Sequence, residues 1–250
     1  MPRLAVIGGS GFSSLPGLVP LETIPIQSPY GLPSGPAIRG RLGDRELLFL
    51  ARHGGDQMIP PHDVNYRANI DGLRQCGAEW VVGLGAVGGI GQPYGPGVLA
   101  VPDQLIDYTY GRAHTFFTAG TGGKEVNHIE FTEPYCEQLR QALLHSGAAA
   151  GLSPMDGGTY GATQGPRLET AAEVRRLERD GCDLVGMTGM PEAALAREAG
   201  LCYACLAFVV NWAAGKGSGT SLLSEMHCNL DLCIQGVVSV LETLVRTHGD

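Results

Sequence analysis

The sequence lacks any stretch close to the roughly 20 consecutive apolar residues that a membrane-spanning helix needs. It also lacks a basic surplus, because 25 Asp and Glu outnumber 17 Lys and Arg and give a formal net charge of −8. No basic cluster offsets this balance, so we expect neither a membrane partner nor a nucleic-acid partner. The first apolar run leads directly into glycines, without the layout of a signal peptide. We therefore expect a soluble, cytoplasmic protein.

Several familiar catalytic signatures are absent as well. The chain contains no GxxxxGK[ST] loop, which argues against a nucleoside triphosphate as ligand. It contains neither HExxH nor GxSxG, which excludes the common metallopeptidase and α/β-hydrolase signatures. The seven cysteines are scattered, and no second Cys/His pair stands at metal-ligand spacing from the CxxC of Cys202 and Cys205. We expect buried, reduced thiols and no metal site.

Glycine is abundant, with 38 residues among 250, and 44% of the residues are hydrophobic. A chain of this length buries about three quarters of its unfolded surface, so it needs no disulfide or metal to fold. Its apolar runs alternate with helical patterns, and no linker separates them. We therefore predict a single α/β domain over residues 1–250, with a mixed, partly parallel β-sheet surrounded by helices.

Apolar runs and the Pro, Gly and Asp residues that border them predict the elements. The Pro- and Gly-rich region 16–44 predicts β meanders, and AGTGGK (119–124) predicts a loop tip. The predicted strands are Leu4–Ile7, Glu46–Ala51, Trp80–Leu84, Leu99–Val101, Tyr203–Val210 and the shorter Asp183–Val185. The predicted helices run from Asp63 as cap to Gly77, from Pro134 to Gly147, from Leu168 to Asp180, from Pro191 to Gly200, and along a C-terminal segment with Ile234, Val238, Leu241 and Val245 on one face.

Three predicted strands end in residues suited to binding an anion. The first runs into the turn GGSGF, where backbone N–H groups and Ser10 can donate hydrogen bonds. A dinucleotide fold would need a helix there, but prolines in the following SSLPGLVP prevent one. The second strand ends at Arg52 and His53, and the third lies before Thr188 at a helix N-terminus. Each has a plain explanation as a tight turn, a surface pair or a helix cap, but together they indicate phosphate.

A further apolar strand, in FVVNWAAGK, ends in the carboxamide of Asn211. A turn residue would explain it, since Asn is common in turns. A ligand would explain it too, because open α/β sheets bind ligands at the carboxyl ends of their strands. Both interpretations stay open on the residues alone.

The segments GGSGF, LFLARHG, PPHDVNYRANI, TQGPRLET and MTGMPEAALAREAG, in this order, resemble the methylthioadenosine phosphorylase and purine nucleoside phosphorylase family as far as about Lys216. The resemblance implies one domain with a distorted, barrel-like sheet, assembled as a homotrimer with sites near the subunit interfaces. In that family phosphate attacks the anomeric carbon of a purine nucleoside. Inorganic phosphate is therefore expected as co-substrate, with no cofactor, no metal and no covalent enzyme intermediate.

Carried over residue by residue, the resemblance implies roles for specific side chains. His128 would reach the 5′ end of the sugar in a neighbouring subunit, and Met187 would lie under the ribose. Ser10 stands where the family often has Thr, and Gly85 replaces a Thr hydroxyl of adenosine-type relatives. The expected phosphate-binding residues are Ser10, Arg52, His53, Gly85, Ala86 and Thr188; the expected substrate-binding residues are Met187, Asn211, Trp212, Ala213, His128, Leu223 and Glu169; Asn211 and His53 are expected to be catalytic.

Asn211 and Ala213 carry the expected base specificity. Adenine-selective relatives have Asp at both positions, and a carboxylate accepts a hydrogen bond from the 6-amino group. A carboxamide instead donates to O6 and N7 of a 6-oxopurine, and it stabilises the negative charge that develops on the departing base. We therefore expect a hypoxanthine or guanine nucleoside.

The 5′ substituent is expected near GTSLLSEMH, where Leu222 and Leu223 offer apolar surface for a methylthio group and His227 offers a polar partner for a hydroxyl. The segments VVNWAAGK and MTGMPEAALARE look most like those of bacterial methylthioinosine phosphorylases. The expected reaction converts S-methyl-5′-thioinosine and phosphate to hypoxanthine and 5-methylthioribose 1-phosphate. The alternatives are phosphorolysis of inosine or guanosine and, less favoured, of methylthioadenosine. A nucleoside hydrolase and a non-catalytic nucleoside-binding protein are the alternatives from other classes.

Overall fold

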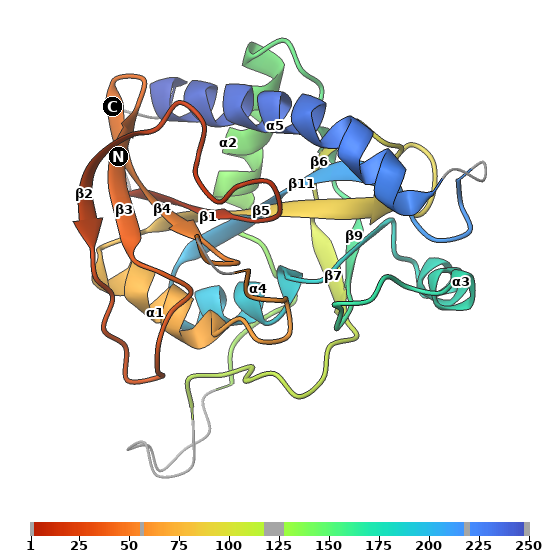
Figure 1. The fold of residues 1–250 in the computed structure, drawn as a ribbon, viewed down its shortest axis with the longest axis horizontal. Coiled ribbons are helices and arrows are strands. Elements are labelled where there is room, and N and C mark those ends of the chain that lie inside the picture. Colours follow the sequence, from red (N-terminus) through yellow and green to blue (C-terminus); the bar gives the residue numbers. More distant parts are fainter. Residues whose placement is uncertain (1–2, 56–57, 118–127, 218–220, 248–250) are drawn as a thin grey trace.

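The computed structural model describes residues 3–55, 58–117, 128–217 and 221–247. Its sheet is organised around β5 (Trp80–Gly89), which pairs in parallel with β1 (Leu4–Gly8) and with β11 (Cys202–Trp212). The far half of β5 also pairs antiparallel with β10 (Leu184–Gly186). Because β5 has three neighbours, the sheet branches at this strand instead of forming one flat layer (Figure 1).

The remaining strands extend the sheet on both sides of β5. On the N-terminal side, β4 (Arg45–Ala51) pairs in parallel with β1, and β3 (Ala37–Leu42) and β2 (Val19–Ile24) follow as antiparallel strands. This confirms the meander predicted between residues 16 and 44. The other side consists of short strands. The apolar pattern predicted β6 (Leu99–Val101) but not β7 (Gln104–Asp107), β8 (Met155–Asp156) or β9 (Thr159–Ala162).

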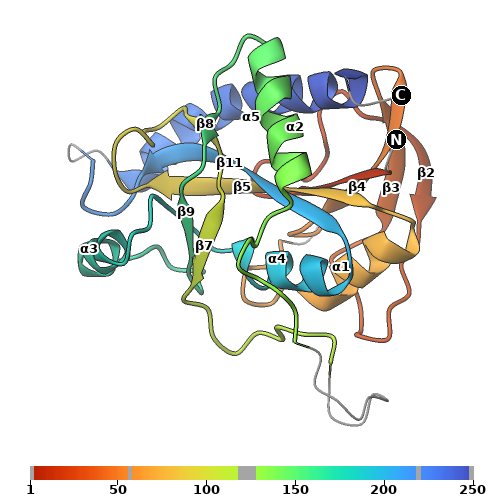
Figure 2. The same ribbon diagram turned by 180° about the vertical axis from the view of Figure 1, so that it is seen from behind.

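Helices cover two faces of the central strands, as the mixed α/β prediction required. One face carries α2 (Glu137–Ala149) and the long α5 (Leu222–Thr247), and the opposite face carries α1 (Tyr66–Gln75) and α4 (Gly189–Glu198) (Figures 1 and 2). The short α3 (Ala171–Arg179) lies at the periphery, beyond β9 (Figure 2).

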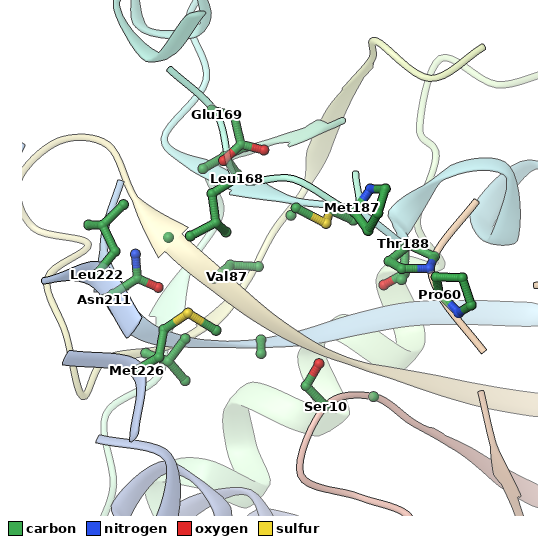
Figure 3. Close-up of a pocket in the computed structure, with 18 of the residues that line it drawn as sticks. Ser10, Pro60, Val87, Leu168, Glu169, Met187, Thr188, Asn211, Leu222 and Met226 are labelled. Carbon is green, nitrogen blue, oxygen red and sulfur yellow. The ribbon is translucent and has the colours of Figure 1, made fainter. Parts of the chain in front are cut away.

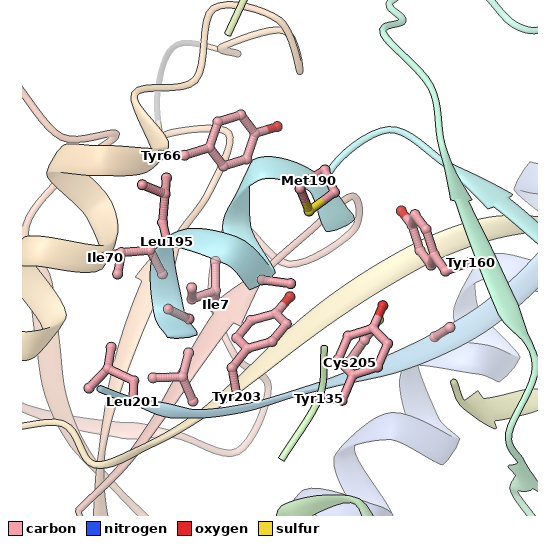
Figure 4. Close-up of a cluster of buried hydrophobic side chains, with 14 of the residues drawn as sticks. Ile7, Tyr66, Ile70, Tyr135, Tyr160, Met190, Leu195, Leu201, Tyr203 and Cys205 are labelled. Carbon is pink, nitrogen blue, oxygen red and sulfur yellow. The ribbon is translucent and has the colours of Figure 1, made fainter. Parts of the chain in front are cut away.

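The core has one layer on each face of the central sheet. In β1, Ile7 packs in the layer with Ile70 of α1 and Leu195 of α4, shown in Figure 4, whereas Val6 packs in the layer with Val237 of α5. Alternate residues of one strand therefore enter opposite layers, as expected for a strand buried on both faces. In length and hydropathy α5 would suit a membrane span, but its Val237, Val240 and Leu244 are completely buried in the core.

The structure corrects the boundaries of several predicted elements. The helix predicted from Asp63 begins later, because the side chain of Asn65 caps it by accepting from the N–H of Ala68. The helix predicted from Pro134 begins after Cys136. Both central strands continue beyond their predicted ends, so Asn211 lies on β11 and not after it. The predicted loop tip 119–124 lies outside the described residues.

The cysteine prediction was wrong in part. Cys136 and Cys202 form a disulfide, and among the free cysteines Cys228 is exposed. The backbone N–H of Cys136 donates to the carbonyl of Tyr203 at 2.8 Å, which brings the start of α2 against the start of β11. The paired cysteines are 66 residues apart, so their spacing in the sequence carried no sign of this contact.

Candidate active site

The carboxyl-terminal parts of β1, β4, β5, β10 and β11 surround one cavity of about 390 Å³. Cavities of this size commonly bind small organic ligands. Figure 3 shows Ser10, Thr188 and Asn211 on different sides of it, each from a different segment of the chain. The strand ends that the sequence singled out separately therefore face a common space.

The glycine turn after β1 forms one wall of the cavity. A Cβ atom on Gly9 would lie 2.6 Å from the carbonyl oxygen of Leu84 and 2.9 Å from Nη1 of Arg52, so this position accepts only glycine without a rearrangement. The backbone N–H of Phe12 donates to the carbonyl of Gly9 at 3.0 Å and closes the turn. Ser10 is consequently left exposed on the cavity wall.

Arg52 is almost completely buried behind this turn and is paired with a carboxylate. Its Nε and Nη2 donate to the two oxygens of Glu192, both at 2.7 Å, and Nη1 donates to the carbonyl of Leu84 at 2.8 Å. The hydroxyl of Tyr203 donates to the same carboxylate at 2.8 Å. Burial alone would lower the pKa of Arg52, but the charge and hydrogen bonds of Glu192 outweigh it and raise that pKa. Each terminal nitrogen keeps one further N–H for a ligand.

His53 lines the cavity beside Arg52 as a neutral imidazole. Burial, followed by the charge of Arg52, lowers its pKa below the ordinary value of 6.5, although a hydrogen bond to the carbonyl of Ile59 opposes the shift. Nδ1 lies 2.8 Å from that carbonyl, which can only accept, so Nδ1 carries the proton. Nε2 is therefore an acceptor, suited to a protonated phosphate oxygen or a sugar hydroxyl.

Thr188 lies at the opposite wall, between β10 and α4. It occupies the N-cap position of α4, yet its side chain makes no capping bond, so the plain explanation as a helix cap is not supported. The guanidinium of Arg112 holds the backbone around it, since Nη1 donates to the carbonyls of Met187 at 2.8 Å and Met190 at 2.6 Å. Nη2 of Arg112 also donates to the carbonyl of Gln164 at 2.8 Å. The sequence analysis did not single out Arg112.

Asn211 reaches the cavity because β11 contains a bulge. Val209 pairs with Val87 and Asn211 pairs with Gly88, so the register against β5 shifts between them. A bulge lets neighbouring residues share one side of a strand, and both Val210 and Asn211 line the cavity. Nδ2 of Asn211 donates to the carbonyl of Trp212 at 2.6 Å, which leaves its second N–H and its oxygen for a ligand.

Glu169 faces the same end of the cavity as Asn211 and Leu168, as Figure 3 shows. Among the described residues that line this cavity, Glu169 is the one with a carboxylate side chain. Its Oε1 accepts a hydrogen bond from the hydroxyl of Thr163 at 2.6 Å. The loop that carries it ends at α3, where Thr170 and Glu173 form a capping box.

Apolar side chains form the remaining walls. Leu222 and Met226 come from the start of α5, and Leu223 stands at the cavity mouth with 59% of its surface exposed. His227 does not line the cavity, since it is exposed and its Nδ1 contacts the carbonyl of Leu223 at 2.6 Å on the helix surface. The segment from Met58 to Pro61, which the sequence analysis did not propose, also faces the cavity.

Most of the site residues predicted from the sequence are brought together, and three are not. Gly85 points away, towards the sulfur of Cys205, while the next residue Ala86 lines the cavity. The backbone N–H of Trp212 donates to Glu225, and its ring packs against Gly95 outside the cavity. His128 is exposed and does not line the cavity of its own chain. The predicted residues that line the cavity are Ser10, Arg52, His53, Ala86, Glu169, Met187, Thr188, Asn211, Ala213 and Leu223.

Within the described residues, no group of three or more His, Cys, Asp or Glu side chains is arranged to hold a metal ion. Glu192 and Tyr203 are further residues behind the site that the sequence analysis did not single out. The sequence offered one signal for Glu192, its place in the first turn of the helix that follows Thr188. Nothing in the sequence indicated that it pairs with Arg52, 140 residues away.

Comparison with known proteins supports a single family over nearly the whole chain. The family model described as the phosphorylase superfamily matches residues 3–246. The chain is 52% identical over 244 residues to the "Probable S-methyl-5'-thioinosine phosphorylase" of Xanthomonas campestris pv. campestris, covering 97% of each protein. It is 45% identical over 229 residues to the "6-oxopurine nucleoside phosphorylase" of Pyrococcus furiosus, covering 90% of this chain and 85% of that one.

The structural comparison agrees with these sequence relatives. The methylthioadenosine phosphorylase from Schistosoma mansoni, solved in complex with tubercidin, superposes with a TM-score of 0.91 at 30% identity. The match covers 100% of this chain and 92% of that one. With the fold shared over its whole length and relatives above 50% identity, the chain belongs to the phosphorylase superfamily.

Proposed function

We propose that this protein is a pentosyltransferase that cleaves a 6-oxopurine nucleoside with inorganic phosphate. One observation carries the proposal, namely that Glu169 and Asn211 line the same cavity as Ser10, Arg52, His53 and Thr188. Glu169 and Asn211 can form hydrogen bonds with the edge of a purine base, and the other four residues can bind an oxyanion. The names of the relatives support the same class of reaction.

The donor and acceptor pattern of the base end suits a 6-oxopurine. Such a base has an N–H at N1 and acceptors at O6 and N7, so Glu169 would accept from N1 while Asn211 donates to O6 and N7. A 6-aminopurine has a lone pair at N1 and would place it against the carboxylate of Glu169. Buried polar groups left unpaired in this way give strong discrimination. Ala213, whose side chain carries no charge, leaves no second acceptor for a 6-amino group.

The reaction breaks the bond between C1′ of the sugar and N9 of the base. The bonding electrons leave with the purine, and the second N–H of Asn211 would stabilise this charge at N7 and O6 more strongly as it grows. A phosphate oxygen forms the new bond to C1′, and the base takes a proton to leave as neutral hypoxanthine or guanine. The remaining N–H groups of Arg52, with Ser10, Thr188 and the Ala86 backbone, would hold the phosphate below the ribose. Met187 would lie under the sugar ring.

The 5′ substituent would be methylthio, because the wall formed by Leu222, Leu223 and Met226 is apolar. A 5′-hydroxyl needs a polar partner, and His227, the candidate from the sequence, does not reach the cavity. The proposed substrate is therefore S-methyl-5′-thioinosine. Phosphorolysis of inosine or guanosine is the second candidate, favoured by the name of the Pyrococcus furiosus relative and by the open mouth of the cavity at Leu223.

The proposed assembly is a cytoplasmic homotrimer in which His128 of one subunit completes the site of the next. The exposed position of His128, outside the cavity of its own chain, supports this arrangement. The proposed cavity needs no cofactor to polarise the substrate, because Asn211 and the oxyanion donors face it directly.

A substrate panel tests the proposed function. The enzyme is assayed with methylthioinosine, methylthioadenosine, inosine, guanosine and adenosine, with and without phosphate, and free base and sugar 1-phosphate are measured. We expect phosphate-dependent turnover, highest kcat/KM for methylthioinosine, and a preference for 6-oxopurines over 6-aminopurines. Preference for adenine nucleosides would contradict the roles of Glu169 and Asn211. Turnover without phosphate would indicate a hydrolase, and binding without release of free base would indicate a non-catalytic nucleoside-binding protein.

A further inference from the structure

Thr163 lies directly after β9 and is fixed to the end of β10. Its backbone N–H donates to the carbonyl of Gly186 at 2.8 Å, which continues the parallel pairing of the two strands. Its own carbonyl accepts from Nη2 of Arg112 at 3.4 Å. Both the N–H and the carbonyl of Thr163 are therefore hydrogen-bonded, so the backbone that carries its hydroxyl is fixed at the end of the sheet.

The Thr163 hydroxyl is directed at Glu169. Oγ1 donates to Oε1 of Glu169 at 2.6 Å and lies farther, at 3.3 Å, from the carbonyl of Gly186. Hydrogen bonds to an ionised carboxylate are shorter and stronger than those between neutral groups, so the bond to Glu169 dominates. Within the described residues Thr163 is the hydrogen-bond partner of this carboxylate, and the second carboxylate oxygen remains for a ligand.

The side chain of Glu169 could also point into a second cavity. It lies on the wall between the active-site cavity and a neighbouring cavity of about 430 Å³, which Thr163 lines as well. The neighbouring cavity is lined by Arg167 and Arg176, which are already paired with Glu173 at 2.7 Å and Asp180 at 3.6 Å. A rotatable glutamate between two cavities needs an anchor if it is to present its charge to only one of them.

We propose that Thr163 is a positioning residue for base recognition: its hydroxyl holds the carboxylate of Glu169 in the orientation that accepts from N1–H of a 6-oxopurine. This inference rests on the proposed function, because it assigns Glu169 to the base. Thr163 does not line the active-site cavity and acts through Glu169. The hydroxyl therefore contributes to the choice of base without touching it.

Two variants of one position separate the hydroxyl from the shape of the side chain. Thr163→Val keeps the branched shape and removes the donor, whereas Thr163→Ser keeps the donor. We expect Thr163→Val to lower kcat/KM for 6-oxopurine nucleosides about 10- to 100-fold, the range for losing a hydrogen bond to a charged group. The ratio of 6-oxopurine to 6-aminopurine efficiency should fall with it, while KM for phosphate stays unchanged. Thr163→Ser should restore most of both quantities.

A double-mutant cycle shows whether the effect passes through Glu169. In a Glu169→Gln background, Thr163→Val should have little further effect on base selectivity, because the carboxylate that it positions is gone. Equal effects in both backgrounds would overturn the inference, as would unchanged selectivity in Thr163→Val or a loss in Thr163→Ser as large as in Thr163→Val. A wild-type enzyme without 6-oxopurine preference would instead refute the proposed function. The two failures are thus distinguishable.

Discussion

Asn211 is the residue on which the choice of base depends most directly. Its amide has one N–H bound to the carbonyl of Trp212 at 2.6 Å and one available for O6 and N7. Asn211→Asp removes both donors and places a carboxylate beside the departing base, where negative charge develops. We expect kcat/KM for methylthioinosine and inosine to fall about 100- to 1,000-fold, the usual cost of losing one donor to a developing charge.

The activity of Asn211→Asp on 6-aminopurine nucleosides serves as the control for this prediction. The second substrate class, 6-aminopurine nucleosides, offers a donor that a carboxylate at position 211 can accept, so its efficiency should stay the same or rise. KM for phosphate should not change, because Asn211 and the oxyanion donors lie at different ends of the cavity (Figure 3). An Asn211→Asp enzyme with wild-type efficiency on inosine would show that this residue does not contact the base.

At this scale, the residues that the sequence analysis singled out at the ends of apolar strands are those that line one cavity in the structure. Arg52, His53 and Asn211 were found in this way, because the parallel strands β4, β1, β5 and β11 bring their carboxyl ends together. Thr188 reaches the same cavity from β10, which runs antiparallel to β5. The supporting residues were not found. Glu192 and Thr163 lie behind residues that face the cavity, and only the packing of distant segments pairs them with Arg52 and Glu169.

At the scale of elements, Arg112 joins three segments that frame the site. Its guanidinium donates to the carbonyl of Met187 before α4, to that of Met190 in the first turn of α4, and to that of Gln164 in the loop that leads to Glu169. It also lies 5.4 Å from the centre of the Tyr66 ring. A lysine has one point charge on a flexible stem and cannot bridge these carbonyls at once. We therefore expect Arg112→Lys to displace the loop that carries Met187 and Thr188.

The expected results are a loss of about tenfold or more in kcat/KM for phosphate and a lower Tm. Leaving one buried carbonyl without its donor costs about 2 kcal/mol, which corresponds to roughly 5 °C in a domain of this size. Arg39→Lys is the matched control, because Arg39 forms a partly exposed ion pair with Glu22 on β2 and β3, away from the cavity. If Arg112→Lys keeps both the wild-type Tm and the wild-type phosphate kinetics, the tether is not needed.

The strands and helices were predictable from the sequence where neighbouring residues alone determine them. Apolar runs located β1, β4, β6 and β10 almost to the residue, and prolines and glycines located α1 to α4 to within a few residues. The C-terminal helix was found only by its apolar face from Ile234 onward, and it begins earlier, at Leu222. The bulge at Val210 was not predictable, because it depends on register against β5 and leaves no mark in the composition of β11. The disulfide between Cys136 and Cys202 likewise depends on how α2 docks against β11.

At the scale of the whole molecule, the proposed trimer makes one subunit incomplete. The cavity of a single chain combines an oxyanion end, a base end and an apolar wall, but its mouth is open at Leu223, which is 59% exposed. His128 is exposed, and in the sequence it lies between β7 and α2. Closed cyclic assembly would allow each subunit to cover the site of its neighbour in this way.

Complementation between inactive subunits tests this arrangement. In solution the protein should have a mass near three times 26.2 kDa, measured by light scattering. His53→Ala damages the pocket of its own chain, and His128→Ala should damage the pocket of the next chain, so each homotrimer should be impaired. In co-expressed mixed trimers, a His128→Ala chain can take His128 from a His53→Ala neighbour, and random assembly would restore about a quarter of the sites. Homotrimers that carry both substitutions are the control and should stay impaired. If mixed trimers show only the mean activity of the two parents, His128 does not act across the interface.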